Sequence, residues 1–332
     1  MTRPPIASSK RRVATTRILA LLALVAVAIA VVVARDPERL IRAELVRQRV
    51  AAGLELRRAT LDDHTWVYAA SDDAPRDAPT LVLVHGFTGS KENWYPLASR
   101  LRGRVRLVVP DLPGWGESTR IADADYGYAA QAARLARFVG TVARVDGREV
   151  VLAGHSMGGG IVALAASTHP RSADRVALID AAGVRFRDNA FGRAVLAGRN
   201  PFEVRDAATL RRYLDTVFFD RDAMPSIPWP ADRAYIARRR AQAAFEQRVL
   251  DRIGRSDERV LPGDRADGIA QPTLLLWCAQ DAVIDPSAMA LYAARIPHAR
   301  RALLEGCGHM SIVERPDDVA ALLDLLITGD PR

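Results

Sequence analysis

The sequence predicts an α/β protein in which helices cover both faces of a mostly parallel β-sheet. Short apolar runs recur at residues 80–84, 105–110, 149–153, 175–179, 273–277 and 299–304. Stretches with helical periodicity separate most of these runs, notably residues 126–145, 158–168, 287–295 and 316–327. Because the runs are apolar throughout, we expect strands that are buried on both faces, as in a parallel sheet between layers of helices.

The N-terminal part of the chain carries its excess of positive charge. The formal net charge is +8, yet residues 1–35 hold six basic side chains and no acid, and residues 36–58 hold six arginines against four acids. From residue 59 onward the charges balance. We therefore expect no nucleic-acid partner, since such a partner would require a basic surface on the folded domain.

Residues 18–34 form an unbroken run of 17 uncharged residues behind a basic tail at 1–17. As a helix the run would span about 25 Å, near the lower limit for a bilayer. A basic segment and the Ala28-Ile29-Ala30 site are also features of a signal peptide. The apolar run continues past that site, which favours a retained transmembrane anchor or an uncleaved signal.

The basic cluster at residues 10–12 favours a cytoplasmic N-terminus and a folded domain on the extracytoplasmic side of a membrane. Residues 35–53 predict a basic stalk helix, which either lies on the membrane surface or forms an ordinary stalk.

Residues 54–69 predict a β-hairpin that turns at Asp62 and Asp63, and residues 185–270 contain no convincing strand. A connection of that length needs a structural role. Helical patterning at 231–253 indicates an inserted helical subdomain, which also holds six of the eight phenylalanines. We expect either a cap over an apolar pocket or aromatic side chains that only pack the insertion onto the domain.

Gly154-His155-Ser156-Met157-Gly158 has the G-x-S-x-G pattern and lies where a predicted strand meets a predicted helix. In that context the serine occupies a sharp turn that raises its hydroxyl above the sheet, and the glycines allow neighbouring backbone to pass closely. Ser156 is therefore the candidate nucleophile.

A serine needs a base, and an imidazole base needs an acid that orients it. His309 follows the last predicted strand, at the end where α/β sheets place their active sites, whereas His298 precedes it. Asp281 follows the strand at 273–277 and is the favoured acid. Asp285 and Asp180 remain alternatives, and Asp285 could instead cap the next helix.

An acyl-transfer site also needs donors for the developing oxyanion. The N–H groups of Met157, directly after the nucleophile, and of Phe87, in the loop after the first parallel strand, are the candidates. Trp115 either lines the substrate pocket or packs the domain. No cluster has metal-ligand spacing, and Gly158-Gly159-Gly160 does not form a phosphate loop, so we expect neither a metal nor a cofactor.

Five segments together resemble the α/β-hydrolase superfamily over roughly residues 60–328. They are HGFTGSKENW from His85, DLPGWGES from Asp111, GHSMGG from Gly154, the acid at Asp281 and GCGHMSIVERP from Gly306. Within the superfamily the chain looks most like membrane-anchored monoacylglycerol lipases and related bacterial lipases. It is less closely similar to hydrolases that cleave carbon–carbon bonds in ring-fission products.

The resemblance implies an eight-stranded sheet with core segments 54–184 and 271–332 and a lid at 185–270. It also implies a triad of Ser156, Asp281 and His309, with Phe87 and Met157 as oxyanion donors. Cys278 departs from the family pattern, which usually has glycine there. Cys278 and Cys307 should lie near each other after adjacent strands, either as a disulfide or as two buried thiols.

These observations predict a serine hydrolase that cleaves a lipid ester, of the monoacylglycerol type, and that contacts the membrane through residues 18–34. The alternatives are hydrolysis of small soluble esters or of carbon–carbon bonds, and a non-catalytic membrane-bound binding protein. The oligomeric state has no signature in the sequence.

Overall fold

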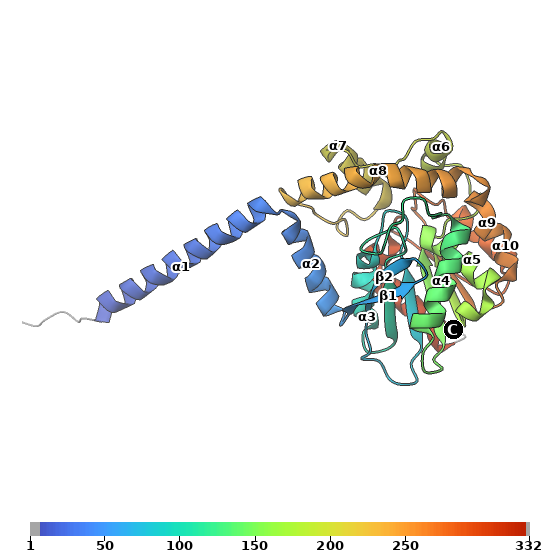
Figure 1. The fold of residues 1–332 in the computed structure, drawn as a ribbon, viewed down its shortest axis with the longest axis horizontal. Helices are drawn as coiled ribbons and strands as arrows, with labels where there is room; N and C mark the ends of the chain where they lie inside the picture. The colour runs from blue at the N-terminus through green and yellow to red at the C-terminus, as the bar shows by residue number, and fades with distance from the viewer. Residues whose placement is uncertain (1–6, 330–332) are drawn as a thin grey trace, which may run out of the picture.

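The computed structural model describes residues 7–329, and its centre is one eight-stranded sheet (Figure 1). The strand order is β1-β2-β4-β3-β5-β6-β7-β8. The strands are β1 (Glu55–Leu61), β2 (His64–Ala70), β3 (Thr80–Val84), β4 (Arg106–Pro110), β5 (Val150–His155), β6 (Arg175–Ile179), β7 (Thr273–Cys278) and β8 (Arg300–Leu304). β2 pairs antiparallel with β1 and β4, and every other neighbouring pair is parallel. The predicted mostly parallel, eight-stranded sheet is therefore confirmed.

The central strands are buried on both faces because their side chains alternate between two apolar cores. In β3, Val82 and Val84 belong to the first core, while Leu81 and Leu83 belong to the second. The hairpin of β1 and β2 turns at Asp62, whose φ is 51°. Such a backbone, in the left-handed region, is one that aspartate tolerates in tight turns.

Helices cover both faces of the sheet, as the apolar strands require. On one face lie α4 (Tyr128–Phe138), α5 (Met157–Thr168) and α10 (Ser287–Arg295), whose apolar residues join the first core. On the other face lie α3 (Tyr95–Leu101) and α12 (Pro316–Thr328), which join the second. Short helical turns occur at Lys91–Trp94, Val139–Ala143, Pro170–Ser172, Asp257–Val260 and Ala266–Gly268.

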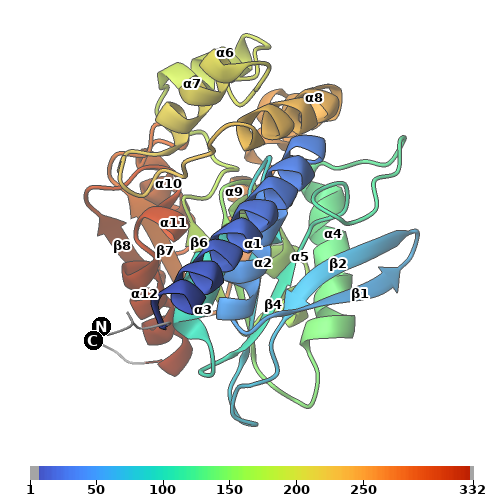
Figure 2. The same cartoon turned by 90° about the vertical axis from the view of Figure 1, so that its left-hand side faces the viewer.

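The chain between β6 and β7 holds four α-helices and, within this fully described stretch, no strand. They are α6 (Ala190–Leu196), α7 (Ala207–Val217), α8 (Ala231–Arg255) and α9 (Leu261–Asp264). We call residues 185–270 the helical insertion. Figures 1 and 2 show α6, α7 and α8 gathered on one side of the body. Phe245 of α8 packs on Trp115 and Tyr126 with ring centroids 5.0 and 5.2 Å apart, so the insertion rests on the loops beyond the sheet.

Two helices precede the sheet, α1 (Ala7–Arg35) and α2 (Glu38–Ala51), and α1 projects away from the body (Figure 1). Within residues 7–329 no helix has both the length and the apolar character needed to span a bilayer. The prediction of a transmembrane helix over residues 18–34, and with it of a single-pass anchor, is therefore wrong. The uncharged stretch of α1 has 17 residues, whereas a spanning helix needs about 20.

Candidate active site

Ser156 occupies a strained turn between β5 and α5. Its φ of 57° and ψ of −122° lie in a region that non-glycine residues rarely adopt. Glycine is required at position 158 because a Cβ there would lie 2.4 Å from the carbonyl oxygens of Val84 and His85. The turn therefore fits closely against the end of β3, and it directs the hydroxyl of Ser156 out of the sheet.

His309 lies between Ser156 and Asp281. Its Nε2 is 2.9 Å from Ser156 Oγ, and its Nδ1 is 2.9 Å from Asp281 Oδ2. The other carboxylate oxygen of Asp281 accepts the N–H groups of Val283 and Ile284 at 2.8 and 2.9 Å. With Nδ1 facing a carboxylate, the proton belongs on Nδ1, and the lone pair of Nε2 faces the serine hydroxyl.

The alternative residues have other partners. Asp285 accepts the N–H of Ser287 at 2.9 Å, at the start of α10. His298 contacts the carbonyl of Gln271 at 3.0 Å. Asp180 accepts the N–H of Cys278, and none of these three side chains has a hydrogen bond or ion pair with His309 in the described chain. The structure thus joins Ser156, His309 and Asp281 by hydrogen bonds, and it leaves Asp285, His298 and Asp180 outside this hydrogen-bonded chain.

Burial sets the protonation state of the base. Ser156, Asp281 and His309 are at most 5% exposed. Burial lowers the pKa of His309 to about 3, opposed by the nearby charge of Glu314, so the imidazole is neutral near pH 7 and able to accept a proton. Burial raises the pKa of Asp281, and the two backbone N–H groups that it accepts oppose this shift.

A disulfide joins the loops that carry the acid and the base. Cys278, three residues before Asp281, is bonded to Cys307, two residues before His309, with Cα atoms 5.3 Å apart. No described cysteine is free. Of the two possibilities left open by the sequence, the structure has the disulfide rather than two buried thiols. Asp180 braces the same loops, because its second oxygen accepts the hydroxyl of Ser311 at 2.5 Å.

Glu314 connects the base loop to the helical insertion, a role that no motif in the sequence indicated. One carboxylate oxygen accepts the N–H of Gly308 at 2.9 Å. The other accepts the N–H groups of Phe219 and Asp220 at 3.0 and 2.7 Å. Glu314 is 5% exposed, so these bonds are shielded from water. The position of His309 therefore depends on a segment of the insertion.

The two candidate oxyanion donors lie on either side of Ser156. Met157 is the first residue of α5, so its N–H has no partner within the helix. The N–H of Phe87 donates to no other group of the described chain. A Cβ at Gly86 would lie 2.9 Å from Ser156 Cβ, so the Phe87 loop passes close to the nucleophile. Both N–H groups are available to a bound oxyanion.

A cavity begins at Ser156 and extends under the helical insertion. Phe186, Phe191 and Phe202 line it, so three of the six insertion phenylalanines face the cavity and the others do not. Trp115 is not among the lining residues; it is 1% exposed and packs behind Phe87 with ring centroids 5.2 Å apart. Further walls come from Val195, Leu250, Ile253, Val283 and Ile284.

No group of three or more histidine, cysteine or carboxylate side chains within residues 7–329 is placed to hold a metal ion. Of Ser156, His309 and Asp281, Ser156 lines the cavity, and the other two lie behind it. This arrangement can activate a hydroxyl, accept its proton and stabilise an oxyanion.

Comparison with known proteins gives a consistent result. The family model described as "alpha/beta hydrolase fold" matches residues 79–316. The crystal structure of a membrane phospholipase A, described as a bacterial virulence factor, is 32% identical, covers 95% of this chain and 98% of that one, and superposes with a TM-score of 0.82. Lipase 1 of Psychrobacter immobilis is 29% identical over 82% of this chain and 84% of that protein. Human monoacylglycerol lipase ABHD6 is 26% identical over 86% of each chain.

Proposed function

This chain belongs to the α/β hydrolase fold family, and from that premise we propose that it hydrolyses carboxylic esters of lipids, of the monoacylglycerol type. One observation carries the proposal. The imidazole of His309 is 2.9 Å from the hydroxyl of Ser156 and 2.9 Å from the carboxylate of Asp281, and Ser156 lines a largely apolar cavity. The similarity to lipases, to monoacylglycerol lipase and to a phospholipase A supports the lipid nature of the ester.

In the proposed reaction, Ser156 Oγ attacks the ester carbonyl while His309 Nε2 takes its proton. Asp281 stabilises the imidazolium that forms, and the N–H groups of Phe87 and Met157 bind the oxyanion. His309 then gives the proton to the leaving alcohol, and an acyl group remains on Ser156. Water, deprotonated by His309, attacks this acyl-enzyme and releases the fatty acid.

The helical insertion is proposed to act as a lid. Its Phe191, Val195 and Leu250 supply apolar walls that suit a hydrocarbon chain, whose burial is favourable by about 0.8 kcal/mol per methylene. This wall gives longer acyl chains an advantage that a small soluble ester would not have.

The test combines active-site labelling with a substrate series. Wild type should react with a fluorophosphonate, and Ser156→Ala should not. Ser167→Ala is the matched control, because Ser167 lies on α5 and its hydroxyl donates to the carbonyl of Leu164 at 3.1 Å, apart from the site. If wild type does not react with the fluorophosphonate, the chain is not a serine hydrolase and the proposal fails.

The acyl-chain series tests the lipid assignment. With 1-monoacylglycerols, kcat/KM should rise from short to medium chains as more methylenes enter the cavity. A rate that falls steadily beyond the shortest chains would favour the alternative, a hydrolase of small soluble esters.

A further inference from the structure

The cavity at Ser156 has a charged end. Three of its lining side chains carry formal charge, namely Arg185, Asp188 and Arg259. Arg185 and Asp188 are exposed and Arg259 is half-buried, whereas the phenylalanines of the lining are mostly covered. The charged side chains therefore mark the solvent-facing mouth, and the apolar walls lie inside it.

The two arginines come from segments that pack together. Arg185 lies in the loop after β6, and Arg259 lies in the helical turn at Asp257–Val260. In α9, directly after that turn, the N–H of Gly263 donates to the carbonyl of Gly183, two residues before Arg185, at 2.8 Å. A Cβ at Gly263 would lie only 2.4 Å from a methyl of Val184. Because the backbones are in contact there and both arginines line the cavity, Arg185 and Arg259 belong to the same edge of the cavity.

This edge is close to the reacting serine. The N–H of Ala182 donates to the carbonyl of Ser156 at 3.0 Å, and Arg185 follows three residues later. Three residues of extended chain span at most about 11 Å. A group attached a few bonds away from an ester bound at Ser156 is therefore within reach of the arginine side chains.

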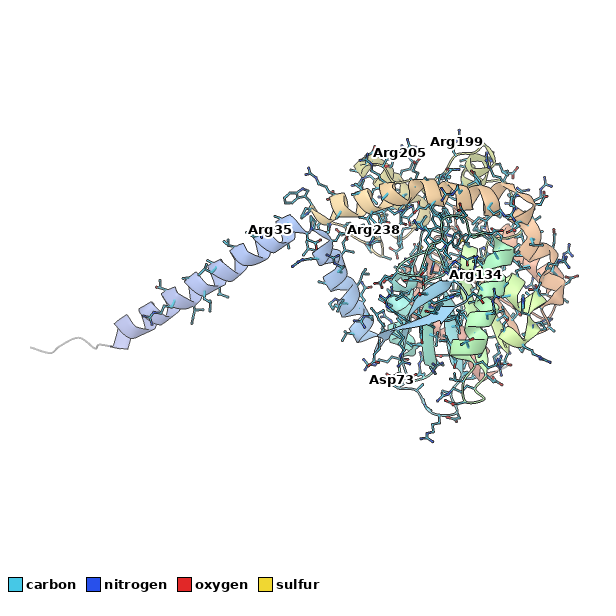
Figure 3. All side chains as sticks on the ribbon, viewed as in Figure 1. Arg35, Asp73, Arg134, Arg199, Arg205 and Arg238 are labelled. Carbon is cyan, nitrogen blue, oxygen red and sulfur yellow. A yellow bond between two sulfur atoms is a disulfide. The ribbon has the colours of Figure 1, made fainter. Side chains whose placement is uncertain are left out.

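Neither Arg185 nor Arg259 has a hydrogen bond or ion pair from its guanidinium within the described chain. Two other arginines of the insertion do have partners: Arg252 pairs with Glu258 at 2.7 Å, and Arg255 pairs with Asp251 at 3.1 Å. Other arginines of the insertion, such as Arg199 and Arg205, lie on its outer side (Figure 3). The cavity mouth thus holds two arginines with all donors available, and their fork geometry fits phosphate oxygens.

Resting on the proposed ester hydrolysis, we propose that this mouth binds a phosphate group, and that the preferred substrate is a single-chain lipid ester with a phosphate on its glycerol. Arg185 and Arg259 bind the phosphate, Ser156 attacks the ester, and the acyl chain occupies the apolar walls. Asp188 opposes anion binding, which leaves a formal charge of +1 at the mouth.

The experiment compares two acyl-matched substrates, octanoylglycerol and octanoylglycerol phosphate, below the concentrations at which they form micelles. We expect kcat/KM to be higher for the phosphate by about tenfold or more, the effect of one charge-assisted hydrogen bond. Arg185→Gln/Arg259→Gln should remove this preference mainly through KM while the rate on octanoylglycerol changes little. Asp188→Asn should increase it.

The matched control is Arg187→Gln/Arg265→Gln, which removes two exposed arginines of the same segments that do not line the cavity. The control should keep the wild-type preference. Free inorganic phosphate distinguishes a phosphate site from a phospholipid site. If its inhibition constant for octanoylglycerol hydrolysis by wild type equals the dissociation constant of octanoylglycerol phosphate, the mouth binds phosphate but does not select a lipid.

Two outcomes separate the proposals. Equal kcat/KM for both substrates in wild type, or the same ratio in wild type and the cavity-mouth variant, would overturn the phosphate site and leave ester hydrolysis standing. If wild type hydrolyses neither substrate, the proposed function fails, and the phosphate site is then tested by measuring the affinity for the two lipids. Ser156→Ala should then bind octanoylglycerol phosphate about tenfold more tightly than octanoylglycerol, and equal binding would refute the phosphate site as well.

Discussion

Removal of the Cys278–Cys307 disulfide should weaken the fold much more than the chemistry. The bond closes a loop with a sequence separation of 29 residues, and both cysteines are fully buried. In the chain-entropy treatment, a loop of this length stabilises the folded state by about 3.6 kcal/mol. For a chain of this size that corresponds to a decrease in Tm of about 6 °C.

The effect on catalysis should be smaller because hydrogen bonds still join the acid and base loops. The side-chain oxygen of Gln280 accepts the N–H groups of Gly306 and Cys307, and the N–H of Gln280 donates to the carbonyl of Cys307. A displacement of His309 by about 1 Å would reduce the rate about a hundredfold. With these bonds in place, we expect kcat/KM to fall by less than about tenfold.

The assay is urea unfolding of oxidised wild type, reduced wild type and Cys278→Ala/Cys307→Ala, with thiol titration of each sample. Reduced wild type keeps both sulfur atoms, so its difference from the double variant isolates lost packing from the lost cross-link. The reasoning is refuted if oxidised and reduced wild type have the same free energy of unfolding, or if two free thiols are found without reductant.

Three further outcomes follow from the site. Gly158→Ala should lower kcat at least about a hundredfold, because its Cβ would lie 2.4 Å from the carbonyl oxygens of Val84 and His85 and must displace the nucleophile turn; steady-state kinetics on folded protein test this, and unchanged kcat would contradict it. The acid limb of the kcat/KM profile should lie below pH 6.5, since burial lowers the pKa of His309 and activity is lost only as pH falls through that lowered value; a limb at or above 6.5 would contradict it. Glu314→Gln should move the acid limb of the kcat/KM profile to lower pH, because the charge of Glu314 raises the pKa of His309. The same variant should lower thermal stability, because a neutral amide forms weaker hydrogen bonds with the three backbone N–H groups that Glu314 accepts. An acid limb at the wild-type pH would show that the charge of Glu314 does not act on His309.

The sheet and the nucleophile turn were predictable because their signals are local. A strand buried on both faces must be apolar at every position, which marks β3 and its neighbours along the sequence. The turn at Ser156 needs glycine where backbones approach closely, and these glycines lie within a few residues of Ser156 in the sequence. The order of serine, acid and histidine then placed Asp281 and His309 on segments that the structure brings within 2.9 Å of each other.

The N-terminal segment shows where a local pattern was misleading. The uncharged run at residues 18–34 was interpreted as a membrane-spanning helix, but the criterion for a span is a combination of length and apolar character that no described helix meets. A run at the lower limit of length is compatible with several environments, and the residues themselves do not choose among them.

By itself, the sequence determined the α/β class and the nucleophile turn, because each follows from periodicity or from a requirement that acts over a few residues. It favoured His309 and Asp281 as the partners of Ser156 and left other carboxylates open. The tertiary structure alone decided which carboxylate faces His309, that Cys278 and Cys307 are bonded, and that Glu314 ties the base loop to the insertion. It also decided which arginines stand unpaired at the cavity mouth. These features depend on contacts between segments far apart in the chain, and such approach distances are set only by the packing of the whole molecule.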